Sequence, residues 1–175
     1  EAIESALAQT YDNTEIIVIN DGSKDEGKTA EIARSYGEKI RYFEKENGGV
    51  ATALNVGVEK MTGEYLSWLS HDDLYTPNKV ADQINFLKDN PGSRKAVLYG
   101  DFSLIDEHGR LMYDVHVPTV SPSRFILKLV SSSLVHGCTT LVPKVCFETV
   151  GNFNPRLRTT QDYDLWFRLA REFRF

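Results

Sequence analysis

The sequence predicts an α/β fold with a mostly parallel central sheet and helices on both faces. Short β-branched runs alternate with amphipathic helical patterns along most of the chain, which is the order that parallel strands joined by helices require. The run at 15–20 (Glu-Ile-Ile-Val-Ile-Asn) is typical of a strand buried on both faces. Turns rich in Gly, Asn and Asp separate the elements and mark their ends.

The first half of the chain is expected to contain three helices and two strands. Ile3, Ala6 and Leu7 follow an amphipathic pattern, and Gly37 stands at the C-cap position of the second helix. The expected elements are a helix at 1–9, a strand at 15–20, a helix at 29–36, a strand at 40–43 and a helix at 50–61.

The second half continues the alternation and adds a hairpin. Pro77 suits a first helical residue, and Asn90-Pro91-Gly92 ends that helix. The turn Asp106–Gly109 lies between two apolar runs, which predicts antiparallel strands. The expected elements are a strand at 65–70, a helix at 77–89, a strand at 96–100, hairpin strands at 102–105 and 111–115, a helix at 123–130, a strand at 139–142 and a helix at 161–171.

The chain is expected to be one domain, 1–175, taken from a longer protein. No internal repeat, low-complexity tract or linker divides it. It opens at Glu1 without a Met, already inside a helical pattern, and ends at Phe175 without a stop signal. We therefore expect the first strand of the sheet to be missing from this chain.

Composition narrows the function classes. The 20 basic and 25 acidic residues give a net charge of −5, which argues against a nucleic-acid partner. The two cysteines, Cys138 and Cys146, provide no disulfide framework and are expected to be buried free thiols in a reducing compartment. With no signal peptide and no apolar run of the ~20 residues that a membrane span requires, we expect a cytoplasmic chain.

Asp72 and Asp73 are the first candidate site. They follow an apolar, aromatic run that ends at the position where α/β sheets bind ligands. A pair of carboxylates there suits a cation such as Mg²⁺, which takes one or two carboxylates plus substrate phosphates. The alternative is that the pair only caps the helix beginning near Pro77, because Asp also favours helix starts.

Two Gly-containing turns are further candidates. Asp21-Gly22-Ser23 follows a buried strand, so Asp21 could accept hydrogen bonds from a ligand while Ser23 bonds phosphate or ribose. Asn47-Gly48-Gly49 precedes a helix N-terminus, which favours anions. The alternative for each is a connecting turn, since Asp, Gly, Asn and Ser are the commonest turn residues.

Asp162 lies in the first turn of the last expected helix. A carboxylate there usually stabilises the helix dipole, but in a cleft it could take a proton from a sugar hydroxyl. The histidines are scattered singly and form no spaced metal pair. Among them, His136, just before Gly137-Cys138, is the one of interest.

Taken in order, these motifs resemble the family 2 glycosyltransferases, which have the GT-A fold. The resemblance rests on the ordered set and runs over nearly the whole chain. The matching segments are 2–11 (AIESALAQTY), 17–23 (IVINDGS), 46–50 (ENGGV), 63–65 (GEY), 72–77 (DDLYTP), 150–153 (VGNF) and 161–166 (QDYDLW).

The resemblance implies a role for each acidic residue. Asp21 looks like the acid that contacts the nucleotide base, usually uracil, with Ser23 nearby. Asp72 looks like the last Asp of the family's DxD motif, which holds Mn²⁺ or Mg²⁺ on the donor diphosphate, and Asp73 would support it. Asp162 looks like the catalytic base that deprotonates the acceptor hydroxyl, in a reaction that inverts the anomeric carbon.

The chain departs from the family pattern in several places. Asn20 replaces an Asp before Asp21, and Ser70 replaces the first Asp of the DxD motif, which lowers the charge of both places. Leu54 stands where many members have Arg, and Gln161 stands where Glu is common.

The resemblance implies a metal-dependent enzyme that moves a sugar from a nucleotide-diphosphate sugar, expected to be a UDP-sugar, to a saccharide or lipid-linked acceptor in bacterial surface-glycan assembly. Any association with the inner face of the membrane would use parts outside this chain. Two alternatives remain open. One is a sugar nucleotidyltransferase, although no Gly-rich triphosphate loop with Lys or Arg is visible. The other is an inactive nucleotide-sugar-binding module, favoured by Asn20 and Ser70.

Overall fold

The computed structural model describes residues 1–175 and begins with the expected strand–helix alternation. Strand β1 (Ile17–Asn20) pairs in parallel with β2 (Arg41–Glu44), in a register that places Ile17 opposite Arg41 and Asn20 opposite Glu44. Because both strands run the same way, the turns that follow them leave the same edge of the pair.

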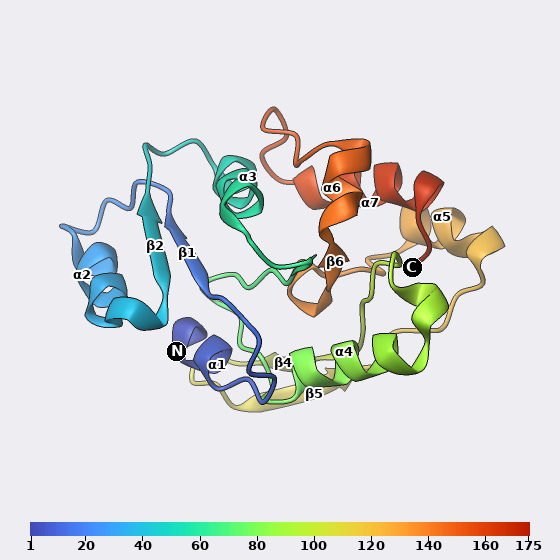
Figure 1. Cartoon of the computed structure of the whole chain (residues 1–175), viewed down its shortest axis with the longest axis horizontal. Helices are drawn as coiled ribbons and strands as arrows, with labels where there is room; N and C mark the ends of the chain where they lie inside the picture. Colours follow the sequence, from blue (N-terminus) through green and yellow to red (C-terminus); the bar gives the residue numbers. More distant parts are fainter.

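Helices flank this strand pair in Figure 1, with α2 on one side and α3 on the other. The chain starts with α1 (Ala2–Leu7), and α2 (Lys28–Ser35) joins the two strands through the 3₁₀ turn η1 (Gly37–Lys39). Gly37 adopts a left-handed φ of 57°, as its expected place at the helix end requires. Helix α3 (Val50–Lys60) packs against β1. The expected helices and strands of the first half are therefore confirmed.

The second half is built on antiparallel contacts. Strand β3 (Tyr65–Leu66) pairs with β6 (Val142–Pro143), a bridge joins Leu98 to Leu141, and β4 (Phe102–Ile105) forms the expected hairpin with β5 (Leu111–Val115). The α/β class is confirmed, and its parallel pairing lies in β1 and β2.

Three expected strands are shorter in the structure. Of 65–70 only Tyr65–Leu66 is in a ladder, and 96–100 contributes a single bridge at Leu98. The strand expected at 139–142 begins instead as the 3₁₀ turn η3 (Gly137–Thr139) and pairs at Val142–Pro143. The ladder stops there because Pro143 has no N–H to donate and α6 follows at once.

The remaining elements are helical. Helix α4 (Lys79–Asp89) begins two residues after Pro77, with Asn78 as its N-cap, and is followed by the turn η2 (Pro91–Ser93). Helices α5 (Pro122–Ser131), α6 (Lys144–Val150) and α7 (Gln161–Glu172) complete the chain. None of these helices combines the length and the apolar character that a membrane crossing demands.

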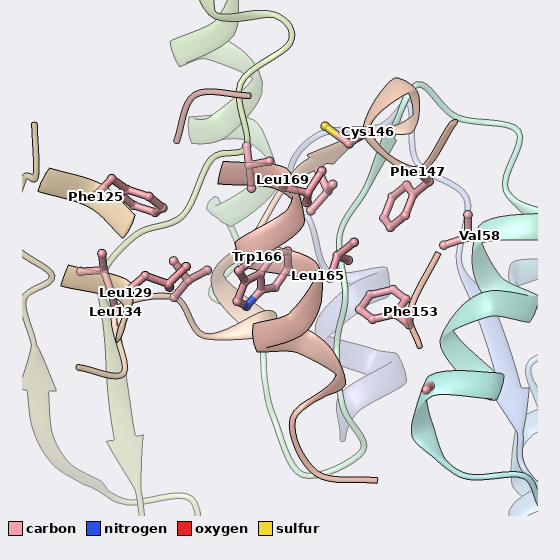
Figure 2. Packing of buried hydrophobic residues seen from close by; sticks show 14 residues of the cluster. Val58, Phe125, Leu129, Leu134, Cys146, Phe147, Phe153, Leu165, Trp166 and Leu169 are labelled. Carbon is pink, nitrogen blue, oxygen red and sulfur yellow. The ribbon is translucent and has the colours of Figure 1, made fainter. Parts of the chain in front are cut away.

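The core is centred on α7. Figure 2 shows Trp166 and Leu165 between residues of α5 and the loop residue Phe153, and Leu165, Trp166 and Leu169 are almost completely buried. Each such side chain contributes about 1.5–3 kcal/mol when it is removed from water. Cys146 is buried in this cluster, Cys138 is partly buried, and both are free thiols. The helix that carries Asp162 is therefore anchored along its length.

Candidate functional site

Asp21 is held by the second Gly-containing turn. Its carboxylate accepts hydrogen bonds from the backbone N–H of Gly48 (3.1 Å) and Gly49 (2.7 Å) and from Lys45 Nζ (2.5 Å). The Asn47 amide also donates to the Asp21 carbonyl at 2.7 Å. Burial alone would raise the pKa of Asp21, but these hydrogen bonds outweigh it and lower the pKa. The two turns thus form one unit around an ionised carboxylate.

Gly22 allows the two turns to approach this closely. It has a left-handed φ of 67°, and a Cβ added there would lie 2.7 Å from the backbone nitrogen of Asn47. A larger residue would meet both a strained backbone and a steric overlap. The Gly is therefore required by the corner that the two turns make.

The side chain of Asn20 also stabilises this corner through hydrogen bonds. Its side chain is 5% exposed, accepts from the Ser23 N–H at 3.0 Å and donates to the Tyr42 hydroxyl at 3.0 Å. Tyr42 in turn donates to Glu44 at 3.3 Å. An amide can donate and accept at once, so this departure from the family pattern fits a buried, uncharged position. Ser23 itself is exposed, beside Asp21.

The sequence reasoning missed Lys45. A signal for it existed: Asn20 lies opposite Glu44 in the parallel register, so Asp21 and Lys45 follow the ends of neighbouring strands. Lys45 also donates to the Glu46 carbonyl (2.5 Å) and the Thr52 hydroxyl (3.0 Å). It fixes the position of Asp21 against the start of α3.

Asp72 lies at the tip of the loop between β3 and α4. Its side chain is 73% exposed and accepts no hydrogen bond, and the His71 ring lies beside it, with Nδ1 3.9 Å from a carboxylate oxygen. The loop reaches α4 through Pro77 and Asn78, so Asp72 does not cap that helix. Its oxygens are open to a ligand.

Asp73 points to a different environment. Burial raises the pKa of its carboxyl, and the neighbouring Asp72 raises it further, while a hydrogen bond with the Cys138 thiol lowers it. The nearby His136 also lowers the pKa of the Asp73 carboxyl. The centroid of the His136 ring lies 4.4 Å from the centroid of the Phe102 ring. The residue pair therefore has one exposed carboxylate and one turned towards η3.

Asp162 occupies the first turn of α7, as expected. It is partly exposed, makes no side-chain hydrogen bond or ion pair, and follows the N-cap Thr160. The neighbouring Gln161 is only 6% exposed, and its carbonyl oxygen is buried without a partner. A Glu at this position would bury a charge, so the neutral Gln suits the site.

The approach to α7 is fixed by two polar clamps. Arg168, paired with Asp164, donates to the carbonyl oxygens of Val150 (2.7 Å) and Asn152 (2.8 Å). Asn55 of α3 exchanges two hydrogen bonds with the backbone of Phe153, both at 2.9 Å. The neighbouring Leu54 packs on the hydrophobic core. At this position, apolar packing therefore takes the place of the Arg that many family members have.

The structure joins Asp21 to the Asn47–Gly49 turn and Asp73 to Cys138, while no hydrogen bond links Asp21, Asp72 and Asp162 to one another. No group of three or more His, Cys, Asp and Glu side chains forms a cation site by itself. The chemistry of the donor set still fits a hard cation, because Asp72 offers free carboxylate oxygens and phosphate oxygens of a ligand could supply others.

Known proteins agree with this architecture. The family described as Glycosyl transferase family 2 matches residues 1–132. Uncharacterized glycosyltransferases of Rickettsia felis and Rickettsia typhi are each 51% identical over 174 residues, covering 98% of this chain and 29% and 54% of the relatives. The chain thus spans between about a quarter and a half of the curated relatives it matches most fully.

Two further likenesses are more distant. The minor teichoic acid biosynthesis protein GgaB of Bacillus subtilis is 36% identical over 94 residues, covering 51% of this chain and 10% of that protein. The structure of S. aureus TarS 1–349 in complex with UDP shares the fold, with a TM-score of 0.69 at 21% identity, over 94% of this chain and 48% of TarS. With a match over most of its length and relatives this similar, the chain belongs to glycosyl transferase family 2 and is a glycosyltransferase domain of the GT-A type.

Proposed function

We propose that this domain transfers a sugar from a UDP-sugar to an acceptor hydroxyl, with a divalent cation on the donor diphosphate. The observation that carries the proposal is the contrast between Asp21, which is fixed in a rigid corner at the end of β1, and Asp72 and Asp162, whose carboxylates are free. The TarS complex with UDP supports the choice of nucleotide.

The donor would lie across the strand ends. Asp21 keeps an unfilled acceptor position on the oxygen that Gly49 contacts, where it could accept a hydrogen bond from the uracil imide, and the exposed Ser23 could bond the ribose or phosphate. Asp72, supported by Asp73, would hold Mn²⁺ or Mg²⁺. When bound, the cation neutralises charge on the leaving diphosphate.

Asp162 would act as the base. Its carboxylate accepts the proton of the acceptor hydroxyl as the oxygen forms a bond to the anomeric carbon. The bond from that carbon to the diphosphate oxygen breaks, and its electron pair leaves with UDP. Attack from the face opposite the leaving group inverts the anomeric configuration.

The biological setting is part of the proposal. A teichoic acid biosynthesis protein among the relatives supports a saccharide or lipid-linked acceptor of the cell envelope. We place the reaction on the cytoplasmic side, where nucleotide-sugars are available, with any membrane attachment supplied outside this chain.

Calorimetric titration of UDP into the whole protein, with and without Mn²⁺, tests the donor site. We expect Mn²⁺ to tighten UDP binding, and Asp72→Ala to remove that gain because the cation loses its main protein ligand. Asp89→Ala, which removes an exposed carboxylate at the end of α4, is the matched control and should bind as the wild type does.

Two results would contradict the proposal. UDP binding that ignores Mn²⁺, or that survives unchanged in Asp72→Ala, would remove the cation from the mechanism. No binding of UDP, GDP or dTDP at all would remove the nucleotide-sugar donor from the proposal.

A further inference from the structure

The amine of Lys79 is turned inward at the start of α4. Nζ donates to the Thr140 carbonyl at 2.8 Å and to the Ser67 hydroxyl, and it lies 4.5 Å from the centroid of the Tyr75 ring. Lys79 forms no ion pair with a carboxylate. Its partners are a hydroxyl, a carbonyl and an aromatic face.

Two of these partners, Ser67 and Tyr75, lie at the two ends of the loop that carries Asp72. Ser67 directly follows β3 and precedes the loop, and Tyr75 follows the loop in the sequence. The Tyr75 and Ser67 hydroxyls are also hydrogen-bonded to each other, at 2.8 Å. Ser67, Tyr75 and Lys79 therefore close a ring of contacts across the two ends of one loop, and Thr140 ties that ring to the segment before β6.

The outer side of the loop is fixed by α1 and by the residues that follow it. The Tyr75 N–H donates to the Ser5 hydroxyl at 3.1 Å, and the Thr10 N–H donates to the Pro77 carbonyl at 2.9 Å. The Gln9 amide donates to the Thr76 carbonyl at 2.8 Å. The C-terminal end of the loop is thus held on two sides, while its tip at Asp72 is exposed.

The buried amine is costly for the fold. Burial lowers the pKa of Lys79 to about 7, and no carboxylate compensates for it. The groups around it include the Cys138 thiol, whose own pKa burial raises to about 11 and which contacts Asp73. A side chain of the same length without the amine would pack here more cheaply, so the amine is expected to serve the geometry of the loop.

We propose that Lys79 is a positioning residue for the donor site: by joining Ser67, Tyr75 and Thr140, it holds both ends of the 68–74 loop so that Asp72 meets the cation and the diphosphate. This inference rests on the proposed function. Lys79 itself touches neither ligand, and it acts through the shape of the loop. Residues that orient a metal ligand in this way typically change metal affinity about 10- to 100-fold when they are replaced.

Lys79→Met tests the inference, because Met keeps much of the length and loses every donor. The readout is the gain in UDP affinity that Mn²⁺ provides, measured by calorimetry on the whole protein. We expect that gain to fall about 10-fold or more, while UDP affinity without metal stays at the wild-type value because the Asp21 corner is intact. Lys88→Met, on the exposed face of the same helix, is the matched control and should change neither quantity.

A second pair of variants covers the case in which Lys79→Met does not fold. Ser67→Ala and Tyr75→Phe each remove one hydroxyl of the ring, and each should reduce the Mn²⁺-dependent gain in the same direction. An unchanged gain in the folded variants would overturn the inference, as would an equal loss of binding with and without metal. If the wild-type protein shows no Mn²⁺-dependent binding, the proposed function fails and the inference falls with it.

Discussion

Asp21 and Asp72 both follow strands, yet the structure treats them in opposite ways. Asp21 accepts hydrogen bonds from Lys45, Gly48 and Gly49 and is mostly buried, whereas Asp72 is 73% exposed and accepts none. Asp162 resembles Asp72, because it too has no partner. The Asp21 carboxylate is part of the fold, whereas the Asp72 and Asp162 carboxylates are available to bind a ligand or to take part in chemistry.

The difference separates a structural role from a role in ligand binding or catalysis. A carboxylate whose hydrogen bonds are largely satisfied defines a shape, and it contributes to stability even without a ligand. A carboxylate without partners contributes little to the fold, so its removal should affect ligands or chemistry alone. The comparison therefore predicts that variants of Asp21 and variants of Asp72 or Asp162 will differ in unfolding as well as in activity.

The largest effect is expected at Asp162. Asp162→Asn should lower the turnover rate about 10²- to 10⁴-fold, since an amide cannot take the acceptor proton. The midpoint of thermal unfolding should hardly move, because the side chain has no partner to lose. Release of UDP from a UDP-sugar in the presence of acceptor measures the first quantity, and calorimetry measures the second.

Glu172→Gln, at the far end of the same helix, is the control for Asp162→Asn. It changes the same charge without reaching the site. Turnover that is unaffected in Asp162→Asn would show that another group takes the proton. A large loss of stability would show that Asp162 belongs with Asp21.

A smaller effect, on stability, is expected at Asp21. Asp21→Asn keeps the shape but replaces a charged acceptor by an amide whose NH₂ faces Lys45 or the turn N–H groups. Hydrogen bonds to charged groups contribute about 1.5–3 kcal/mol, so the free energy of unfolding should fall by an amount in this range. Asp72→Asn should leave it within about 0.5 kcal/mol of the wild type. Equal losses in urea unfolding would contradict the contrast between the two residues.

Much of this contrast could be anticipated from the sequence, and part of it could not. The run at 15–20 and the Gly-containing turns predicted the strand ends and the residues that follow them. The length of β3 was not predictable, because it depends on a distant partner: Leu66 pairs with Val142, which is 76 residues away along the chain. The Lys79 contacts were missed for the same reason: Thr140 approaches only when β6 pairs with β3.

Residue roles are the least accessible from sequence. Asn20 looked like a lost carboxylate, but the structure gives it a donor and an acceptor partner that an Asp could not serve equally. Leu54 stands where many members of the family have Arg, and the structure packs it on the core. In both cases the buried surroundings, which come from distant parts of the chain, decide what the side chain does.

The smallest effect is in the acid range and concerns Asp21 alone. Hydrogen bonding outweighs burial and lowers the folded pKa of Asp21 from its usual 3.8, so below that value the unfolded state binds more protons than the folded state. The contribution of Asp21 to stability is therefore complete above the usual pKa of 3.8, which applies to the unfolded state, and is lost as the pH falls through the lower pKa of the folded state. The difference in unfolding free energy between the wild type and Asp21→Asn should shrink steadily on going from about pH 5 downwards.

Urea unfolding of the two proteins over this range measures that difference directly. Glu15, whose pKa hydrogen bonds from Thr62, Arg41 and Gly63 lower to about 2 against the effect of burial, titrates in both proteins and cancels. A difference that stays the same as the pH falls would contradict the prediction, because it would show that the hydrogen bonds from Lys45, Gly48 and Gly49 do not favour the ionised form of Asp21.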